Sequence, residues 1–263
     1  MKLSISNIGW EPCNDANIYD LMLKYGYFGL EIAPTRIFPE KPYDMLIEAR
    51  AWADNMKEKY GFDVPSMQSI WFGRQENMFA SEKERNILLQ YTKKAIDFAA
   101  VLNCRNLVFG CPRNRSVPEG ADSEIAVAFF KELGDYAAEK GTVIGMEANP
   151  PIYNTNYIND TMSALRLIKQ VNSKGFLLNL DVGTMIQNEE DVTELVGQVH
   201  LINHVHISEP GLKPIKERAL HRELMELLES ESYHGYISIE MGKSESLSII
   251  EEKMRYVGYM FSD

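Results

Sequence analysis

Four short segments in the second half of the chain end in side chains that commonly bind divalent cations. The segments read GMEANP, NLDVGT, HVHISEP and ISIEMG, and the side chains are Glu147, Asp181, His206 and Glu240. Each segment is an apolar run that stops at a polar loop, which is typical of a short strand and the turn after it. Three carboxylates and one imidazole favour Mn²⁺, Mg²⁺ or Co²⁺, and Zn²⁺ also accepts these ligands. The four residues therefore predict a site for one divalent metal ion.

The period-two alternation of a strand places these four side chains on equivalent faces. Two residues before each candidate ligand stand small or polar residues, namely Gly145, Asn179, His204 and Ser238. The residues between are all apolar, namely Met146, Leu180, Val205 and Ile239. In a closed parallel sheet the outward side chains pack under helices and must be apolar. We therefore expect the four ligands to point into the interior.

Each candidate ligand has a more ordinary explanation when it is taken alone. A carboxylate at a strand end is often a loop cap or a surface charge, and a single histidine is often a hydrogen-bonded core residue. Several buried carboxylates facing one another would repel, and burial without compensation would force protonation. A bound cation removes this conflict, so the agreement of four strands favours a metal site.

Short apolar stretches alternate with amphipathic ones eight times along the chain. The expected strands are residues 3–8, 29–33, 64–70, 106–109, 143–148, 176–181, 202–208 and 236–241. The expected helices are residues 17–25, 43–60, 82–102, 123–140, 161–172, 192–199, 217–230 and 244–259. The glycines expected to cap helices are Gly26, Gly61, Gly141, Gly175 and Gly235. The alternation predicts an α/β fold, a single (β/α)₈ TIM barrel domain over residues 1–263, with a doubly wound sheet as the weaker alternative.

Composition excludes several classes of partner. The net charge of −11 argues against nucleic acid, which proteins bind through Lys and Arg at phosphates. No apolar run approaches the ~20 residues that span a bilayer, and the N-terminus reads as a first strand rather than a secretion signal. The three cysteines are odd in number and show no CxxC spacing, so we expect free thiols in the cytoplasm. Formation of a homo-oligomer stays open.

The chain resembles the xylose isomerase-like barrels, which include sugar isomerases and epimerases of the ketose 3-epimerase type. The resemblance covers nearly the whole chain and is most specific in MEANPPIYNTNYI, NLDVGT, HVHISEP and YISIEM. It implies that Glu147, Asp181, His206 and Glu240 bind one divalent metal ion. It also implies that Glu147 and Glu240 are the catalytic acid/base pair acting on a carbohydrate substrate.

This resemblance implies a metal-dependent epimerase or isomerase of a keto-sugar or related polyol ketone, acting through an ene-diolate. The alternative is a dehydratase or lyase of a keto-sugar or keto-inositol, including cleavage of 3-keto-glycosides, at the same metal site. Two departures keep this alternative open. Thr184 stands where the epimerases have a substrate-contacting His, and the Arg after their metal-binding His has no direct match. Lys213, Lys216 or His221 could replace that Arg. A DNA-repair nuclease and a non-catalytic sugar-binding barrel are weaker possibilities.

Further residues near the expected strand ends are candidates for binding the substrate. They are Glu31, Gln68, Trp71, Arg113, Tyr153, Lys213 and His221. Glu31 could instead pair with Arg36, and Trp71 could be an ordinary core residue. Arg113 could be a solvated charge, and His221 could be a surface capping residue.

Overall fold

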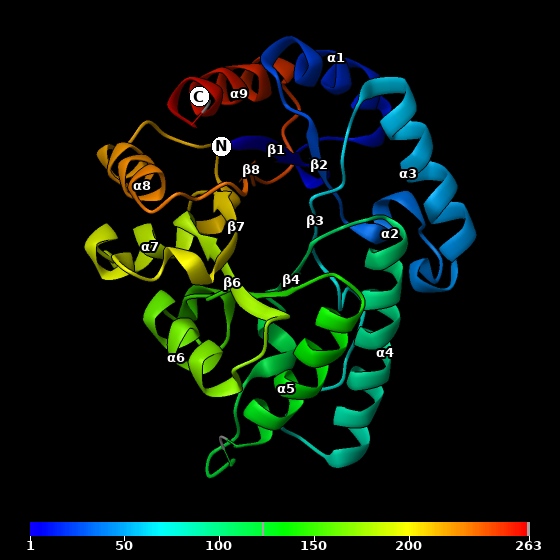
Figure 1. Ribbon diagram of the computed structural model, residues 1–263, viewed down its shortest axis with the longest axis vertical. Coiled ribbons are helices and arrows are strands. Elements are labelled where there is room, and N and C mark those ends of the chain that lie inside the picture. Colours follow the sequence, from blue (N-terminus) through cyan, green and yellow to red (C-terminus); the bar gives the residue numbers. More distant parts are fainter. Residues whose placement is uncertain (123, 262–263) are drawn as a thin grey trace.

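Eight parallel strands stand inside a ring of helices in the computed structural model of the chain, which describes residues 1–122 and 124–261 (Figure 1). The strands are β1 (Lys2–Ser6), β2 (Gly29–Glu31), β3 (Ser66–Met67), β4 (Asn106–Phe109), β5 (Ile144–Met146), β6 (Phe176–Asp181), β7 (Ile202–Ile207) and β8 (Tyr236–Ile239). They pair in the order β2-β1-β8-β7-β6-β5-β4-β3. The two ends also meet, because the Ile32 N–H donates to the Ser66 carbonyl oxygen at 3.1 Å. The predicted (β/α)₈ TIM barrel is confirmed.

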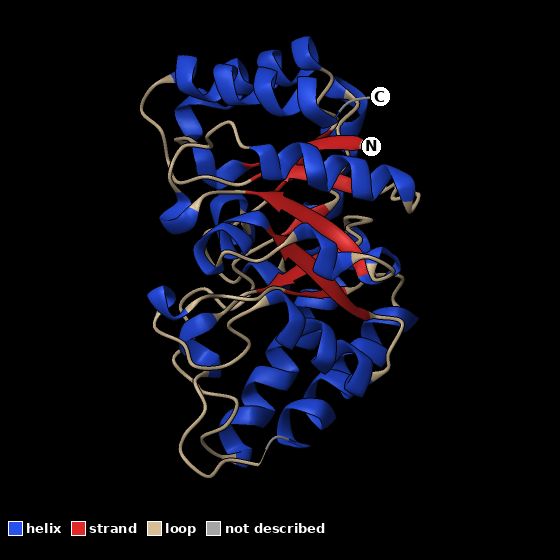
Figure 2. Cartoon of the chain, turned by 90° about the vertical axis from the view of Figure 1, so that its left-hand side faces the viewer, coloured by secondary structure: helices blue, strands red, loops and turns tan. Residues whose placement is uncertain are grey.

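The helices cover the outside of the barrel (Figures 1 and 2). They are α1 (Asp15–Tyr25), α2 (Pro34–Ile37), α3 (Leu46–Tyr60), α4 (Glu82–Val101), α5 (Glu124–Glu139), α6 (Thr161–Val171), α7 (Val182–Asn188), α8 (Ala219–Ser230) and α9 (Leu247–Phe261). Short 3₁₀ helices lie in the loops, namely η1 (Asn7–Gly9), η2 (Pro12–Asn14), η3 (Pro42–Asp44), η4 (Pro112–Arg115), η5 (Pro151–Tyr153), η6 (Val192–Leu195), η7 (Val199–Leu201) and η8 (Pro210–Leu212). None of the helices described combines the length and apolar character needed to cross a membrane.

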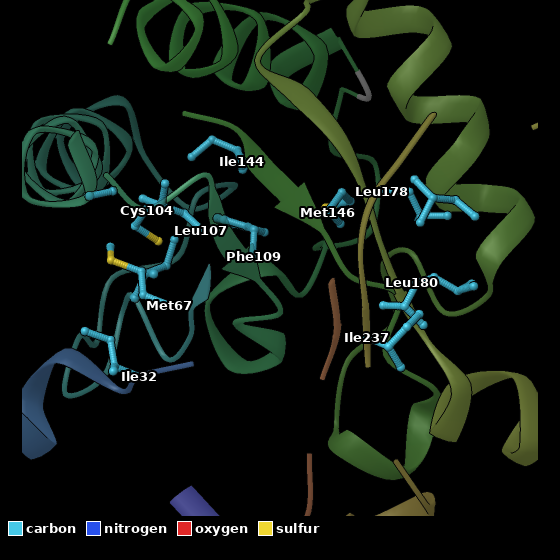
Figure 3. Packing of buried hydrophobic residues seen from close by; sticks show 14 of the residues in the cluster. Ile32, Met67, Cys104, Leu107, Phe109, Ile144, Met146, Leu178, Leu180 and Ile237 are labelled. Carbon is cyan, nitrogen blue, oxygen red and sulfur yellow. The ribbon is translucent and has the colours of Figure 1, made fainter. Parts of the chain in front are cut away.

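The outward side chains of the strands form the core between barrel and helices. Met146, Leu180 and Val205 are completely buried, as the strand parity predicts. Figure 3 shows Leu178 and Leu180 following one another along β6, with Met146 on the adjacent β5. Burial of these side chains fixes the register, because a shift by one residue would turn every ligand to the wrong face.

One expected helix is wrong. The sequence predicts a helix over residues 192–199, whereas helix α7 begins at Val182, directly after β6. The side chain of Asp181 accepts the backbone N–H of Thr184 and so caps this helix at the strand end. Only the 3₁₀ turns η6 and η7 occupy the predicted stretch. The first residue of the expected helix 123–140, Ser123, lies outside the described residues.

Two of the five expected glycine caps are also wrong. Gly26, Gly61 and Gly141 have positive φ angles of 73°, 74° and 76°, as a left-handed cap requires. Gly175 and Gly235 are not in that conformation, and Asn172, with φ of 46°, ends α6 instead. At Gly175 the constraint is space, because a Cβ there would lie 2.0 Å from the carbonyl oxygen of Gly134 in α5.

We predict that Gly175→Ala destabilises the protein by at least ~2 kcal/mol, because the added methyl group meets backbone that must move. Gly9→Ala is the matched control, since its Cβ would have no neighbour nearer than 3.7 Å. It should change the free energy of unfolding by less than about 0.5 kcal/mol. Urea denaturation of both variants measures the difference, and equal stabilities would contradict the close packing of β6 against α5.

Candidate metal centre

The four candidate ligands come together at the carboxyl ends of strands β5 to β8. Glu147, Asp181, His206 and Glu240 each offer a ligand atom, and these atoms all lie within 4.8 Å of one another. The Nδ1 atom of His206 is 3.1 Å from Oε1 of Glu147 and 3.3 Å from Oε2 of Glu240. The His206 ring is fully buried, and each carboxylate residue keeps 8% of its surface exposed. The group is thus open to solvent only through its carboxylates.

Backbone pairing of neighbouring strands brings these side chains to the same level. Asp181 of β6 is paired with His206 of β7, which is paired in turn with Ser238 of β8. Glu147 and Glu240 follow β5 and β8, and their backbone N–H groups still donate to Phe109 at 3.1 Å and to Ile207 at 3.0 Å. The ligands therefore come from the sheet or from residues bonded to it, which limits their movement.

Neutral donors hold two of the carboxylates in place. Asn179 donates to Oε1 of Glu147 at 3.0 Å, and Asn149 donates to its Oε2 at 3.1 Å. Thr184 donates its backbone N–H to Oδ2 of Asp181 at 2.8 Å, and its hydroxyl lies 2.7 Å from the same oxygen. Amides and hydroxyls orient the carboxylates without neutralising them.

Arg115 supports the same region without pairing with a carboxylate. Its fully buried guanidinium donates to the Glu147 backbone carbonyl at 2.8 Å and to Oδ1 of Asn149 at 3.0 Å. Burial lowers the pKa of this guanidinium to about 10, which still leaves it charged at neutral pH. It therefore braces the loop after β5 while the carboxylates remain available.

Burial and mutual repulsion change the acidity of the ligands. Burial first, and then the charges of Glu147 and Asp181, raise the pKa of Glu240 to about 7, although His206 opposes this. Burial and the Glu147 charge likewise raise the pKa of Asp181. Burial alone would lower the pKa of His206, but the carboxylates of Glu240 and Glu31 outweigh it and hold that pKa well above its ordinary value. The four residues therefore retain protons, because one imidazole cannot neutralise three buried carboxylates.

This donor set fits a divalent cation. Three carboxylates and an imidazole nitrogen within 4.8 Å supply the oxygen-rich coordination that Mn²⁺, Mg²⁺ and Co²⁺ prefer. A cation would replace the retained protons and remove the repulsion that raises the carboxylate pKa values. Glu147, Asp181, His206 and Glu240 are therefore the residues that could hold it.

A cavity of about 190 Å³ lies over the ligands. Glu147, Asp181 and Glu240 form part of its wall, together with Glu209 and the predicted substrate-binding residues Gln68 and Tyr153. The hydroxyl of Tyr153 accepts the Gly211 N–H at 2.9 Å, which joins the loops after β5 and β7. No lysine or arginine lines the cavity among the described residues.

Two predicted substrate-binding residues, Glu31 and Trp71, are buried but do not form part of the cavity wall. Glu31 is fully buried and lies 2.9 Å from Nε2 of His206; the alternative partner Arg36 instead pairs with Asp15 at 2.6 Å. Trp71 is a core residue, because its indole N–H donates to Thr92 at 2.8 Å. Strand parity alone does not report how deep in the barrel a side chain lies.

The other three predicted substrate-binding residues are further from the ligands. Arg113 is exposed and donates to Gln75, and Lys213 is exposed in the loop after β7. His221 is buried against α9, with Nδ1 2.9 Å from the Tyr256 hydroxyl, and burial lowers its pKa to about 4. The structure therefore gives none of the three a place in the cavity.

Sequence reasoning did not assign five residues that the structure places at the centre. They are Asn149, Asn179, Ser208, Glu209 and Leu212. Parity was a usable signal for two of them, because Asn179 and Ser208 lie two positions from a ligand. Ser208 donates to Oδ1 of Asp181 and accepts the Gly183 N–H at 2.8 Å. The other three depend on how the loops fold over the barrel.

The fold and the converging ligands define a parallel α/β barrel with a candidate metal centre at the carboxyl ends of its strands. The sequence profile of the xylose isomerase-like TIM barrel family matches residues 19–258. The chain belongs to this family. A comparison with curated protein sequences gave no match.

Several solved structures share the whole fold at low sequence identity. The 3-keto-D-glucoside 4-epimerase from E. coli is 19% identical, with a TM-score of 0.76 and 98% of each chain covered. The D-psicose 3-epimerase from Clostridium cellulolyticum H10, solved with D-tagatose, is 16% identical, with a TM-score of 0.78 and 100% of each chain covered. A family 2 AP endonuclease from Brucella melitensis is 19% identical, with a TM-score of 0.71, 97% of this chain and 98% of the other covered. These similarities show the fold.

We predict that the metal-free protein loses stability as the pH rises from about 6.5 to about 8. The folded-state pKa values of Glu240, at about 7, and of His206 are raised, so the stability they contribute is lost as the pH rises through those values. His204 and His221, whose pKa values are lowered, oppose this loss near pH 6.5, where the unfolded chain still binds protons at histidine. The raised pKa values of His206, Glu240 and Asp181 together outweigh them. Glu240 alone gives a loss on the order of 1 kcal/mol.

Urea denaturation of chelator-treated protein at the two pH values measures this loss. Saturating Mn²⁺ is the control and should make the loss smaller, because a metal ion binds the deprotonated ligands. Stability that stays constant or rises with pH in the metal-free protein would contradict the electrostatic description of the centre.

Proposed function

We propose that the protein is a divalent-metal-dependent epimerase or isomerase of a free keto-sugar or a related polyol ketone. The observation that carries this proposal is the position of two glutamates in one cavity wall. Glu147 and Glu240 both approach the same imidazole nitrogen, at 3.1 and 3.3 Å, and they follow β5 and β8, which have two strands between them. Two carboxylates so placed can each transfer a proton to or from one small molecule.

Mn²⁺, Mg²⁺ or Co²⁺, with Zn²⁺ as a further candidate, would polarise the carbonyl and adjacent hydroxyl of the ketose and stabilise the ene-diolate. One glutamate removes the proton from the carbon next to the carbonyl. The other returns a proton to the opposite face of that carbon, which inverts it. Return to the neighbouring carbon would instead interconvert ketose and aldose. Asn179 and Asn149 keep the Glu147 oxygens oriented during either transfer.

The cavity supports a small, neutral sugar as substrate. Its volume of about 190 Å³ is below the ~300–1,000 Å³ of pockets for larger ligands. Glu209 is the fourth carboxylate in the wall, and its charge is paired with Arg218 at 2.6 Å. Because no described residue of the wall is a Lys or Arg, the cavity does not favour a phosphorylated sugar. The 3-keto-D-glucoside and D-tagatose named for the similar structures are sugars without phosphate.

The alternative is a dehydratase or lyase of a keto-sugar or keto-inositol, including one that cleaves 3-keto-glycosides. Thr184 is the residue that supports this alternative, because it stands where the resemblance to the epimerases implies a histidine. Its hydroxyl lies 2.7 Å from Asp181 and 2.8 Å from the Ala148 carbonyl oxygen, so it is committed to holding a ligand. One glutamate would then remove a proton, and the other would protonate the hydroxyl or alkoxyl group on the next carbon, which leaves as water or an alcohol.

A nuclease function, which the similar AP endonuclease suggests, has less support. The chain carries a net charge of −11, and the cavity wall contains four carboxylates. Both features repel a phosphate backbone.

We also propose a cytoplasmic location and a single domain over residues 1–263. The three unpaired cysteines, Cys13, Cys104 and Cys111, support a reducing compartment.

We predict that the protein, stripped with chelator and reloaded with Mn²⁺ or Co²⁺, exchanges a carbon-bound hydrogen of a free ketose for solvent deuterium. Glu147→Gln and Glu240→Gln should each slow this exchange by at least ~100-fold, because each removes one proton-transfer group. Glu231→Gln is the matched control, since Glu231 bonds the Gly197 N–H at the opposite end of the barrel, and it should retain the exchange rate. Mass spectrometry of the sugars measures the exchange.

The mass of the product separates the two candidate functions. Epimerisation or isomerisation leaves the mass unchanged in ordinary water, whereas elimination loses water or an aglycone. Metal-loaded protein that neither exchanges deuterium nor changes the mass of any sugar in a broad panel of free ketoses and keto-glycosides would contradict both.

A further inference from the structure

Glu31, at the end of β2, lies on the side of the His206 ring away from the carboxylate ligands. Its side chain is fully buried. Oε2 is 2.9 Å from Nε2 of His206 and 3.1 Å from Nε2 of His204. Oε1 accepts a hydrogen bond from Gln68 at 3.3 Å. Both oxygens of this carboxylate are therefore used inside the barrel, below the cavity.

The two nitrogens of His206 face different partners. Nδ1 faces Glu147 and Glu240, and Nε2 faces Glu31. A neutral imidazole carries one proton, and only the nitrogen without it can bind a cation. Whichever group accepts the proton of one nitrogen thus decides whether the other is available. A carboxylate at 2.9 Å is a strong acceptor for an N–H group.

We infer that Glu31 is a positioning residue: its carboxylate accepts the Nε2 proton of His206 and so holds the tautomer and ring orientation in which Nδ1 faces the cation. This inference rests on the proposed function, in that it requires a cation at the four ligands. Glu31 then acts through His206 and does not contact the sugar. An acceptor of this kind also makes the ligating imidazole more basic.

A second ion held by Glu31, His204 and His206 is the competing explanation, because these residues also have ligand atoms within 4.8 Å of one another. Their side chains are at most 2% exposed, and three donors would leave a cation under-coordinated with no access for water. The 2.9 Å contact of His206 is a hydrogen bond to Glu31, whereas Nε2 of His204 lies 3.1 Å from the same oxygen without forming one. Burial and the His206 hydrogen bond therefore favour a proton on Nε2 of His206 over a second ion.

The first experiment compares Mn²⁺ affinity, measured by calorimetry, in wild type, Glu31→Gln and His204→Asn. Glu31→Gln retains the shape of the side chain but removes the charge that fixes the His206 proton, so Mn²⁺ should bind about 10- to 100-fold more weakly. His204→Asn is the matched control, because it removes a neighbour of Glu31 but leaves the bond to His206. Its Mn²⁺ affinity should remain within about threefold of wild type. An unchanged affinity in Glu31→Gln, or equal losses in both variants, would overturn the inference.

A second experiment needs no variant. The Zn²⁺-loaded wild-type protein, labelled with ¹⁵N-histidine, should show an NMR signal for a proton on Nε2 of His206 and none on Nδ1. A proton on Nδ1 instead, or two Zn²⁺ ions bound per chain with neither His206 nitrogen protonated, would overturn the inference.

The outcomes separate this inference from the proposed function. Wild-type protein that binds no metal would end both. Weak Mn²⁺ binding by Glu31→Gln in a protein that exchanges no sugar hydrogen would support the role of Glu31 and count against the sugar chemistry. Normal sugar exchange with equal Mn²⁺ affinity in wild type and Glu31→Gln would support the sugar chemistry and count against the role of Glu31.

Discussion

Electrostatic repulsion among Glu147, Asp181 and Glu240 is the constraint on which the site depends. Their ligand atoms lie within 4.8 Å of one another. Two unit charges at that distance repel by ~3 kcal/mol at an effective dielectric constant of 20, so three ionised carboxylates would strongly destabilise the barrel mouth. The protein limits this cost with His206 and with protons retained by the carboxylates, because the pKa of Glu240 is about 7. A divalent cation would offset most of this negative charge, which is why the centre favours one.

The surrounding residues preserve this negative charge. Asn179, Asn149 and Thr184 donate hydrogen bonds to the carboxylates but carry no charge. The nearest buried guanidinium, Arg115, directs its donors to backbone carbonyls and to Asn149. An arginine paired directly with Glu147 would neutralise that carboxylate and compete with a cation. The barrel thus holds the carboxylates in fixed orientations without neutralising their charge.

The sequence predicts the convergence of the four candidate ligands well because strand parity is a local property. A strand alternates its side chains regardless of its surroundings, so four apolar outward positions identify four inward side chains. Depth in the barrel is different, because it depends on how far each strand is shifted along its neighbours. Parity therefore predicts that Glu31 points inward but does not predict that its carboxylate lies against Nε2 of His206. For Trp71 the sequence offers two readings, and only the packed helices show the core reading, in which the indole N–H reaches Thr92.

The centre divides into a half that fits the family resemblance and a half that does not. The candidate metal ligands fit it, with Glu147, Asp181, His206 and Glu240 brought together. In the substrate half, Thr184 is committed to Asp181, and Arg218 is committed to Glu209 at 2.6 Å. Among the described residues, the cavity wall thus offers a sugar no imidazole, Lys or Arg side chain. Under the proposed function, uncharged groups that could bond sugar hydroxyls are the amides and phenol of the cavity wall, chiefly Gln68, Asn149 and Tyr153. Because these groups carry no positive charge, they do not favour a substrate with a charged substituent such as phosphate.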